Sequence, residues 1–124
     1  MLIHEEVTGQ IIGAAMDVHR TLGPGLLESA YEACMCHELN LRGLAFARQV
    51  ELPVAYKGVL LPCGYRLDLL VADMVVVELK CVESLLPVHE AQLLTYLRLS
   101  GKKVGLLINF YVSQLKDGII RRAL

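Results

Sequence analysis

Residues 65–82, YRLDLLVADMVVVELKCV, contain two runs of aliphatic and β-branched side chains separated by Ala72-Asp73-Met74. Two such runs on either side of a short polar segment are typical of a β-hairpin. We therefore expect one strand over Tyr65–Val71 and a second over Val75–Val82. This hairpin is the centre of the predicted fold.

Three charged residues interrupt these apolar strands. Glu78 and Lys80 are two residues apart, so the two-residue period of a strand places them on one face. Asp68 lies in the facing strand. Burying a charge is costly unless the charge is paired or binds a metal ion. One explanation is a salt bridge between Lys80 and a carboxylate on a solvated sheet face, and the other is a metal site.

The length of the hairpin loop distinguishes these explanations. A two-residue loop, Ala72-Asp73, would put Asp68 and Glu78 on opposite faces, whereas a three-residue loop, Ala72–Met74, sets them opposite each other on one face. We predict the three-residue loop. Two carboxylates and a backbone carbonyl suit a hard ion such as Mg²⁺, and a neighbouring lysine can orient the attacking water or stabilise phosphoryl charge.

Helical spacing of apolar residues flanks this hairpin on both sides. It predicts helices over Glu5–Leu22, Leu27–Leu41 and Val88–Ser100, with a break at the Gly-Pro-Gly of residues 23–25. Alternating residues predict a strand over Val50–Tyr56, where Pro53 indicates a sheet edge.

The C-terminal part completes the expected element order. The apolar run Lys103–Phe110 predicts a strand covered on both faces, and Ile119–Leu124 predicts a short last strand. The order of two helices, three strands, a helix and two strands favours an α/β fold with a mixed central sheet flanked by helices.

Composition limits the kind of protein further. The chain has 124 residues, of which 55% are hydrophobic, and a net charge of −1, which excludes disorder and favours a single domain over residues 1–124. No apolar stretch approaches the ~20 residues of a membrane span, and the acidic start lacks the basic region of a signal peptide. We expect a cytoplasmic protein with no membrane partner, and its high apolar content favours a homo-oligomer.

The four cysteines and four histidines form no zinc-binding motif, because no Cys-x-x-Cys or His-x-x-x-His spacing occurs. We expect the cysteines to be reduced, buried thiols.

The charged core of the hairpin resembles a known family. Asp68 followed by Glu78-Leu79-Lys80 is similar to the Asp…Glu-x-Lys core of the PD-(D/E)XK nuclease superfamily, and Gly25-Leu26-Leu27-Glu28-Ser29-Ala30-Tyr31 resembles the motif of the bacterial GxxExxY proteins assigned to it. The flanking residues 18–25, 57–61 and 107–110 extend the resemblance over nearly the whole chain. It implies a restriction-endonuclease-like αβββαβ core, here preceded by an extra N-terminal helix.

The resemblance also implies roles for individual residues. Asp68 and Glu78 resemble metal-binding carboxylates, with Glu28 and the Leu79 carbonyl as further ligands of Mg²⁺ or Mn²⁺, and Lys80 resembles the catalytic lysine. Gln92 and Tyr96 are similar to the Gln-x-x-x-Tyr motif of exonuclease-like members, and their i, i+4 spacing puts both on one helix face.

Each of these residues also has a purely structural explanation. Glu28 can stabilise a helix N-terminus, Tyr31 and Tyr96 can be packed rings, and Gln92 can be a surface amide. Together with Asp68, Glu78 and Lys80, however, these polar residues fit one site, and a chance arrangement is the poorer explanation.

The leading hypothesis is a metal-dependent nuclease that hydrolyses nucleic-acid phosphodiester bonds, DNA rather than RNA, by metal-activated water. The alternative is a non-catalytic module that keeps the nuclease fold for dimerisation or protein binding. A plain structural domain with a solvated salt bridge is the third explanation.

Overall fold

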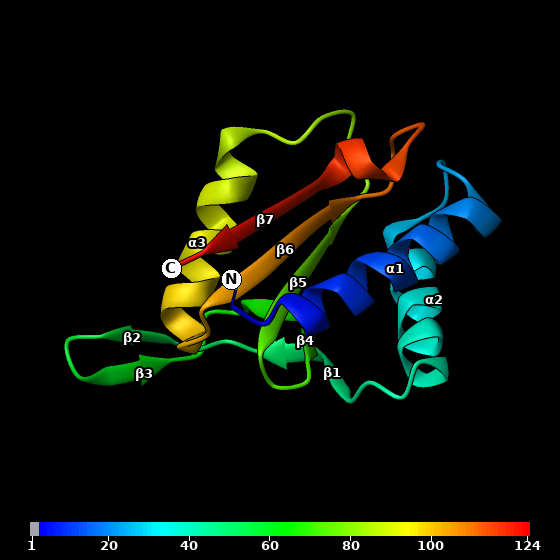
Figure 1. Ribbon diagram of the computed structural model, residues 1–124. Helices are drawn as coiled ribbons and strands as arrows, with labels where there is room; N and C mark the ends of the chain where they lie inside the picture. The colour runs from blue at the N-terminus through cyan, green and yellow to red at the C-terminus, as the bar shows by residue number, and fades with distance from the viewer. Residues whose placement is uncertain (1–2) are drawn as a thin grey trace.

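A five-stranded sheet is the middle layer of the protein in a computed structural model that describes residues 3–124 (Figure 1). The strand order is β1-β4-β5-β6-β7. β5 and β6 are parallel, whereas the other neighbouring pairs are antiparallel, so the expected mixed sheet is confirmed. The strands are β1 (Phe46–Glu51), β4 (Arg66–Val71), β5 (Val75–Lys80), β6 (Val104–Asn109) and β7 (Ile119–Ala123). A short 3₁₀ turn, η1 (Leu115–Gly118), precedes β7.

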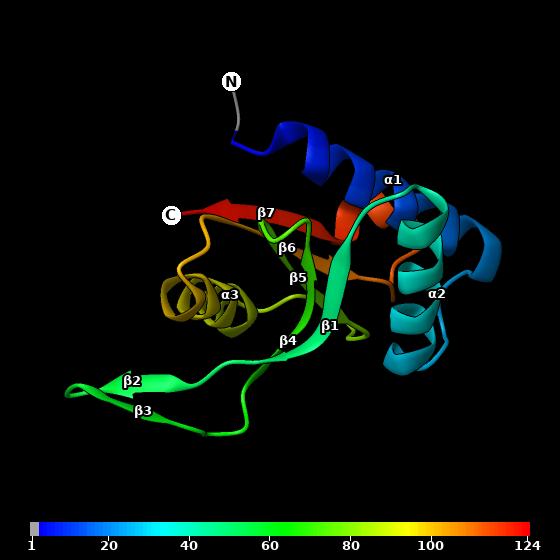
Figure 2. The same ribbon diagram turned by 90° about the horizontal axis from the view of Figure 1, so that it is seen from below.

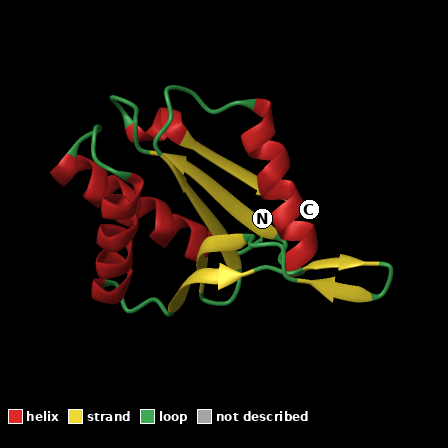
Figure 3. Ribbon diagram, turned by 180° about the vertical axis from the view of Figure 1, so that it is seen from behind, coloured by secondary structure: helices red, strands yellow, loops and turns green. Residues whose placement is uncertain are grey.

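Helices cover both faces of this sheet (Figure 3). α1 (Glu5–Leu22) and α2 (Glu28–Leu41) lie on one face, where their apolar sides form the larger core cluster. α3 (Pro87–Ser100) packs on the other face through Leu93 and Leu97. Because parallel strands need a crossover connection, α3 is the link between β5 and β6.

The β4–β5 hairpin has the predicted three-residue loop. Val71 pairs with Val75, which leaves Ala72–Met74 as the loop. In β5, Val77 belongs to the core cluster under α1 and α2, and Val76 belongs to the cluster under α3. Burial on both faces explains the continuous apolar run of this strand, and alternation places Glu78 on the α3 side.

A second hairpin, β2 (Val54–Tyr56) and β3 (Val59–Leu61), projects from the end of the sheet (Figure 2). The prediction of a single strand over Val50–Tyr56 is therefore wrong, because these residues comprise the end of β1 and the first strand of the projecting hairpin, β2. Pro53 has no N–H to continue the β1 ladder. The chain leaves the sheet at this point.

The elements α2-β1-β4-β5-α3-β6 reproduce the αβββαβ order, with α1 as the extra N-terminal helix. The structure is thus consistent with the expected restriction-endonuclease-like fold, into which the β2–β3 hairpin is inserted. None of the helices in the described part of the chain is both long and apolar enough to cross a membrane.

The four cysteines are free thiols, as expected, but only Cys36 is buried and Cys63 is exposed. The expectation of four buried thiols is wrong because Cys63 lies in the segment that leads from the projecting hairpin back to β4, where no layer covers it.

Candidate active site

The pairing of β4 with β5 stops one residue short of the charged positions. Leu69 pairs with Val77, and the next step along the ladder would join Asp68 to Glu78. Instead, the Asp68 amide donates to Glu78 Oε2 at 2.9 Å, and the Leu79 amide donates to Asp68 Oδ2 at 2.8 Å. Two carboxylates therefore join the strands where the backbone ladder ends.

Burial makes both carboxylates difficult to ionise. Glu78 is only 6% exposed. This burial raises the pKa of Glu78 to about 8, and the negative charge of Asp68 contributes to the rise. Burial also raises the pKa of Asp68, although the hydrogen bond from the Leu79 amide opposes the rise. The pair is therefore a desolvated, acidic site at the sheet's end.

Lys80 supplies a positive charge beside this pair. It is half-buried at the end of β5, and its charge lowers the pKa values of both Asp68 and Glu78. It forms no ion pair with any residue between 3 and 124. The salt-bridge explanation of these charges is therefore not realised among the described residues.

The backbone of Leu79 faces the same gap. Its amide donates to Asp68 across the gap, whereas the carbonyl of the next residue, Lys80, accepts from Phe110 on the opposite side of β5. Because the N–H and C=O of one strand residue point to the same edge, the Leu79 carbonyl also faces β4. This orientation agrees with its expected role as a ligand.

Glu28 approaches from the first turn of α2. With Ser29, Glu32, Gln49 and Asp68 it lines a cavity of about 290 Å³. Partial burial and the negative charge of Asp68 raise its pKa. Within the described residues, no three His, Cys, Asp or Glu side chains are arranged closely enough to hold a metal ion as they stand.

Three polar residues of this cavity region were not predicted. Glu32, only 7% exposed, accepts a hydrogen bond from Arg48 at 2.8 Å and another from Gln49 at 2.6 Å. Its i+4 spacing from Glu28 on one helix was a signal that could have found it. Nothing in the local pattern of β1 indicated Arg48 or Gln49.

Tyr31, the last residue of the Gly-x-x-Glu-x-x-Tyr motif, has a structural role. Its buried ring stacks on Phe110 with ring centroids 4.3 Å apart. Its hydroxyl donates to the Gly23 carbonyl and accepts from the Leu26 amide. Tyr31 thus holds the loop that precedes Glu28, so it positions the start of α2.

Tyr31→Phe should therefore destabilise the protein by about 1–2 kcal/mol, because the Gly23 carbonyl and the Leu26 amide both lose a partner. Urea denaturation measures the change. Tyr56→Phe, at an exposed tyrosine of β2, is the matched control and should leave stability unchanged. Equal stability of Tyr31→Phe and the wild type would contradict the role of the hydroxyl.

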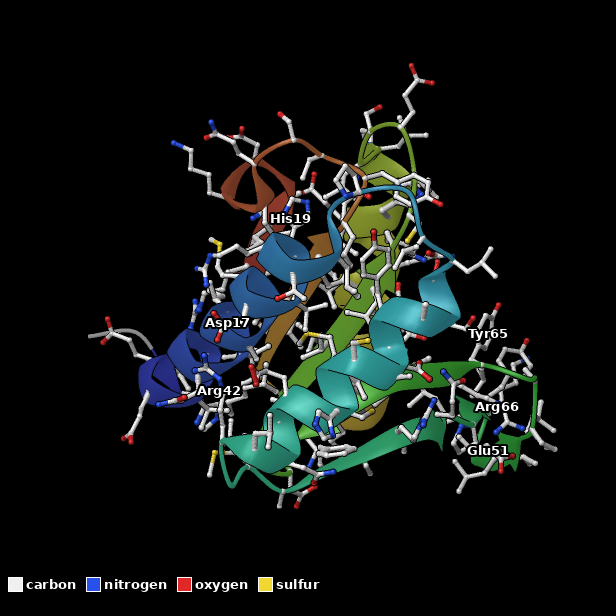
Figure 4. The ribbon with its side chains drawn as sticks, turned by 90° about the vertical axis from the view of Figure 1, so that its right-hand side faces the viewer. Asp17, His19, Arg42, Glu51, Tyr65 and Arg66 are labelled. Atoms are coloured by element: carbon white, nitrogen blue, oxygen red, sulfur yellow. The ribbon has the colours of Figure 1, made fainter. Side chains whose placement is uncertain are left out.

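Gln92 and Tyr96 lie on α3 and line a groove of about 450 Å³ together with Tyr65. The Tyr65 and Tyr96 ring centroids are 6.1 Å apart. Burial raises the pKa of Tyr96, and the negative charges of Glu78 and Asp68 raise it further. Among the described residues, however, the lining of this groove includes none of Asp68, Glu78 and Lys80, so the groove is separate from the cavity that Asp68 lines. In Figure 4, Tyr65 lies beside Arg66, near the foot of the projecting hairpin.

The donor chemistry of the site fits a hard divalent cation. Asp68, Glu78 and the Leu79 carbonyl offer only oxygen atoms, which Mg²⁺ and Mn²⁺ favour. Two desolvated carboxylates with raised pKa values repel each other when ionised, and a bound cation would remove that repulsion. Glu28 lines a cavity with Asp68 but not with Glu78, so of these two carboxylates it faces that of Asp68.

A mixed sheet of this topology with Asp and Glu-x-Lys on adjacent strands defines a restriction-endonuclease-like nuclease domain. The chain belongs to the PD-(D/E)XK nuclease superfamily, whose family model matches residues 5–122. Neither the curated proteins nor the solved structures include a significant match to the chain.

Proposed function

We propose that this protein is a metal-dependent phosphodiesterase that cleaves nucleic acid, with DNA as the expected substrate. The observation that carries the proposal is the pair of desolvated carboxylates, Asp68 and Glu78, that bridges β4 and β5 beside Lys80. Lys80 has no ion-pair partner within residues 3–124. Superfamily membership supports a nuclease activity.

In this proposal the site residues have different roles. Asp68, Glu78 and the Leu79 carbonyl would hold a divalent ion, Mg²⁺ or Mn²⁺, with help from Glu28. When bound, the ion would supply Lewis acidity and an activated water. Lys80 orients that water and stabilises negative charge on the phosphoryl oxygens.

Gln92 and Tyr96 serve substrate positioning in this proposal. Both line the groove on α3, and the charges of Glu78 and Asp68 act on the Tyr96 hydroxyl, so we assign the groove to the substrate strand rather than to the metal ion. A net charge of −1 provides no general attraction for a polyanion. The cation therefore provides the positive potential at the scissile phosphate.

Mn²⁺ should raise the melting temperature of the wild-type protein, because binding to the folded state alone stabilises it. Asp68→Asn should abolish most of this rise. Asp73→Asn is the matched control, since Asp73 lies exposed in the same hairpin and pairs with Lys102. Thermal melts with and without Mn²⁺ measure the effect, and an identical rise in the wild type and Asp68→Asn would contradict the assigned site.

A second candidate is a non-catalytic dimerisation module, which one specific observation favours. The projecting hairpin exposes four large apolar residues, Tyr56, Val59, Leu60 and Leu61. Exposed apolar patches often mark interaction surfaces. This function requires melting that depends on protein concentration and is indifferent to Mn²⁺, which distinguishes it from the nuclease.

A further inference from the structure

Two neighbouring residues of β1 bind the same carboxylate. Arg48 donates to Glu32 Oε2 and Gln49 donates to Glu32 Oε1. In a regular strand, successive side chains point to opposite faces, so Arg48 and Gln49 could not both reach one residue of α2. The strand must therefore depart from regular geometry here.

The backbone of Gln49 shows that departure. Its φ is +51°, in the left-handed region, which non-glycine residues rarely adopt and which costs about 1–3 kcal/mol. The strand keeps its register on both sides, because Arg48 pairs with Leu69 and Val50 pairs with Leu67. The conformation is thus a one-residue kink, and the Glu32 carboxylate holds the side chain that the kink redirects.

The kink lies opposite the acidic pair. The register would place Gln49 opposite Asp68, and this is the one position missing between the paired residues of β1 and β4. On its other edge, Asp68 has also left the regular β4–β5 ladder and exchanges hydrogen bonds with Glu78 and Leu79. The irregularity at Gln49 and the irregular placement of Asp68 therefore occur at one level of the sheet.

We propose that Glu32 is a positioning residue, which acts on Asp68 by holding Gln49 in its left-handed conformation. Gln49 and Glu32 line the same cavity as Asp68. The inference rests on the proposed function, because the geometry it maintains is that of the metal-binding carboxylate. Glu32 itself is occupied by Arg48 and Gln49 and is not assigned as a ligand.

Substitutions at Gln49 separate the backbone conformation from the side chain. Glycine adopts positive φ readily, so Gln49→Gly should keep the kink and lose only the contribution that the Gln49 amide makes to the Asp68 carboxylate, binding Mn²⁺ within about 3-fold of the wild type. Valine opposes positive φ, so Gln49→Val should weaken Mn²⁺ binding about 10-fold or more, the range expected when a ligand's support is lost. Calorimetric titration of Mn²⁺ measures both. Tight binding by Gln49→Val would overturn the proposal.

A double-mutant cycle tests whether Glu32 acts through Gln49. Glu32→Gln should weaken Mn²⁺ binding about 10-fold in the wild-type background. The same change should have little effect in the Gln49→Gly background, where the kink no longer needs to be held. Equal losses in the two backgrounds would show that Glu32 acts directly on the ion or on stability alone, and would overturn the proposal.

A measurement without metal separates this inference from the proposed function. The Asp68 and Leu79 amides are donors to the two carboxylates, so their hydrogen exchange should be slow in the wild type and in Gln49→Gly, and at least about 10-fold faster in Gln49→Val. The Leu70 amide, in the same strand, is the control. If exchange responds as expected but no variant binds Mn²⁺, the positioning stands and the metal-dependent function fails. Unchanged exchange in Gln49→Val overturns the positioning.

Discussion

Glu78→Gln should stabilise the metal-free protein in alkaline solution. The pKa of the Glu78 carboxyl is about 8 in the folded protein against 4.5 for an unperturbed glutamate. Between these values the folded state retains a proton that the unfolded state has released, so the stability of the wild type falls as pH rises from about 4.5 to about 8. Glutamine is never ionised and should remove this decline.

The expected gain for Glu78→Gln is at most about 5 kcal/mol above pH 8, given that the pKa rises from 4.5 to about 8 and each pKa unit corresponds to about 1.4 kcal/mol. Urea denaturation at pH 5 and pH 9 in the presence of a chelator measures it. Glu83→Gln, an exposed glutamate just beyond β5, is the matched control and should leave the pH dependence unchanged. A wild-type pH profile in Glu78→Gln would refute the burial argument.

The same substitution should abolish Mn²⁺-dependent cleavage, because an amide is a far weaker ligand than a carboxylate for a hard ion. A variant that is more stable and inactive would show that the buried charge is retained for function rather than for folding. The wild type should regain the missing stability when Mn²⁺ is added at pH 9.

Lys80→Ala should lower the cleavage rate by about 10²–10⁴-fold while leaving Mn²⁺ binding intact, because the lysine is assigned to the water and the phosphoryl oxygens rather than to the ion. Single- and double-stranded DNA and RNA, incubated with Mg²⁺ or Mn²⁺, provide the assay. The rise in melting temperature with Mn²⁺ should persist in the variant.

The matched control for Lys80→Ala is Lys103→Ala, at an exposed lysine before β6, which should cleave at the wild-type rate. Equal background activity in the wild type and Lys80→Ala would end the enzymatic hypothesis. In that case the dimerisation module, with its exposed hairpin, would become the leading function.

Local patterns were sufficient to predict the hairpin that carries the site. The apolar runs of residues 65–82 and their three-residue loop determined the register up to the Leu69–Val77 pair, beyond which the Asp68 amide donates to the Glu78 carboxylate. The helices were equally clear, because each buries one apolar side against the sheet. Expected and observed bounds of the third helix differ by one residue, which is Pro87 at its start.

The β2–β3 hairpin was missed because its residues alternate like a continuation of β1. Pro53 was correctly seen as a sign of an edge, but the pattern cannot distinguish a strand that continues along an edge from one that leaves the sheet. That distinction depends on whether neighbouring strands are present to receive the hydrogen bonds.

The sequence by itself determined to which residues we assign chemistry, because charges in apolar strands are conspicuous wherever burial is expected. Only the tertiary structure decided how they are held. Glu32 and Gln49 are 17 positions apart and belong to different elements, and the left-handed conformation of Gln49 has no local cause. We infer that it is held by the buried Glu32 carboxylate, which α2 presents beside β1, and contacts between distant segments are absent from any local pattern.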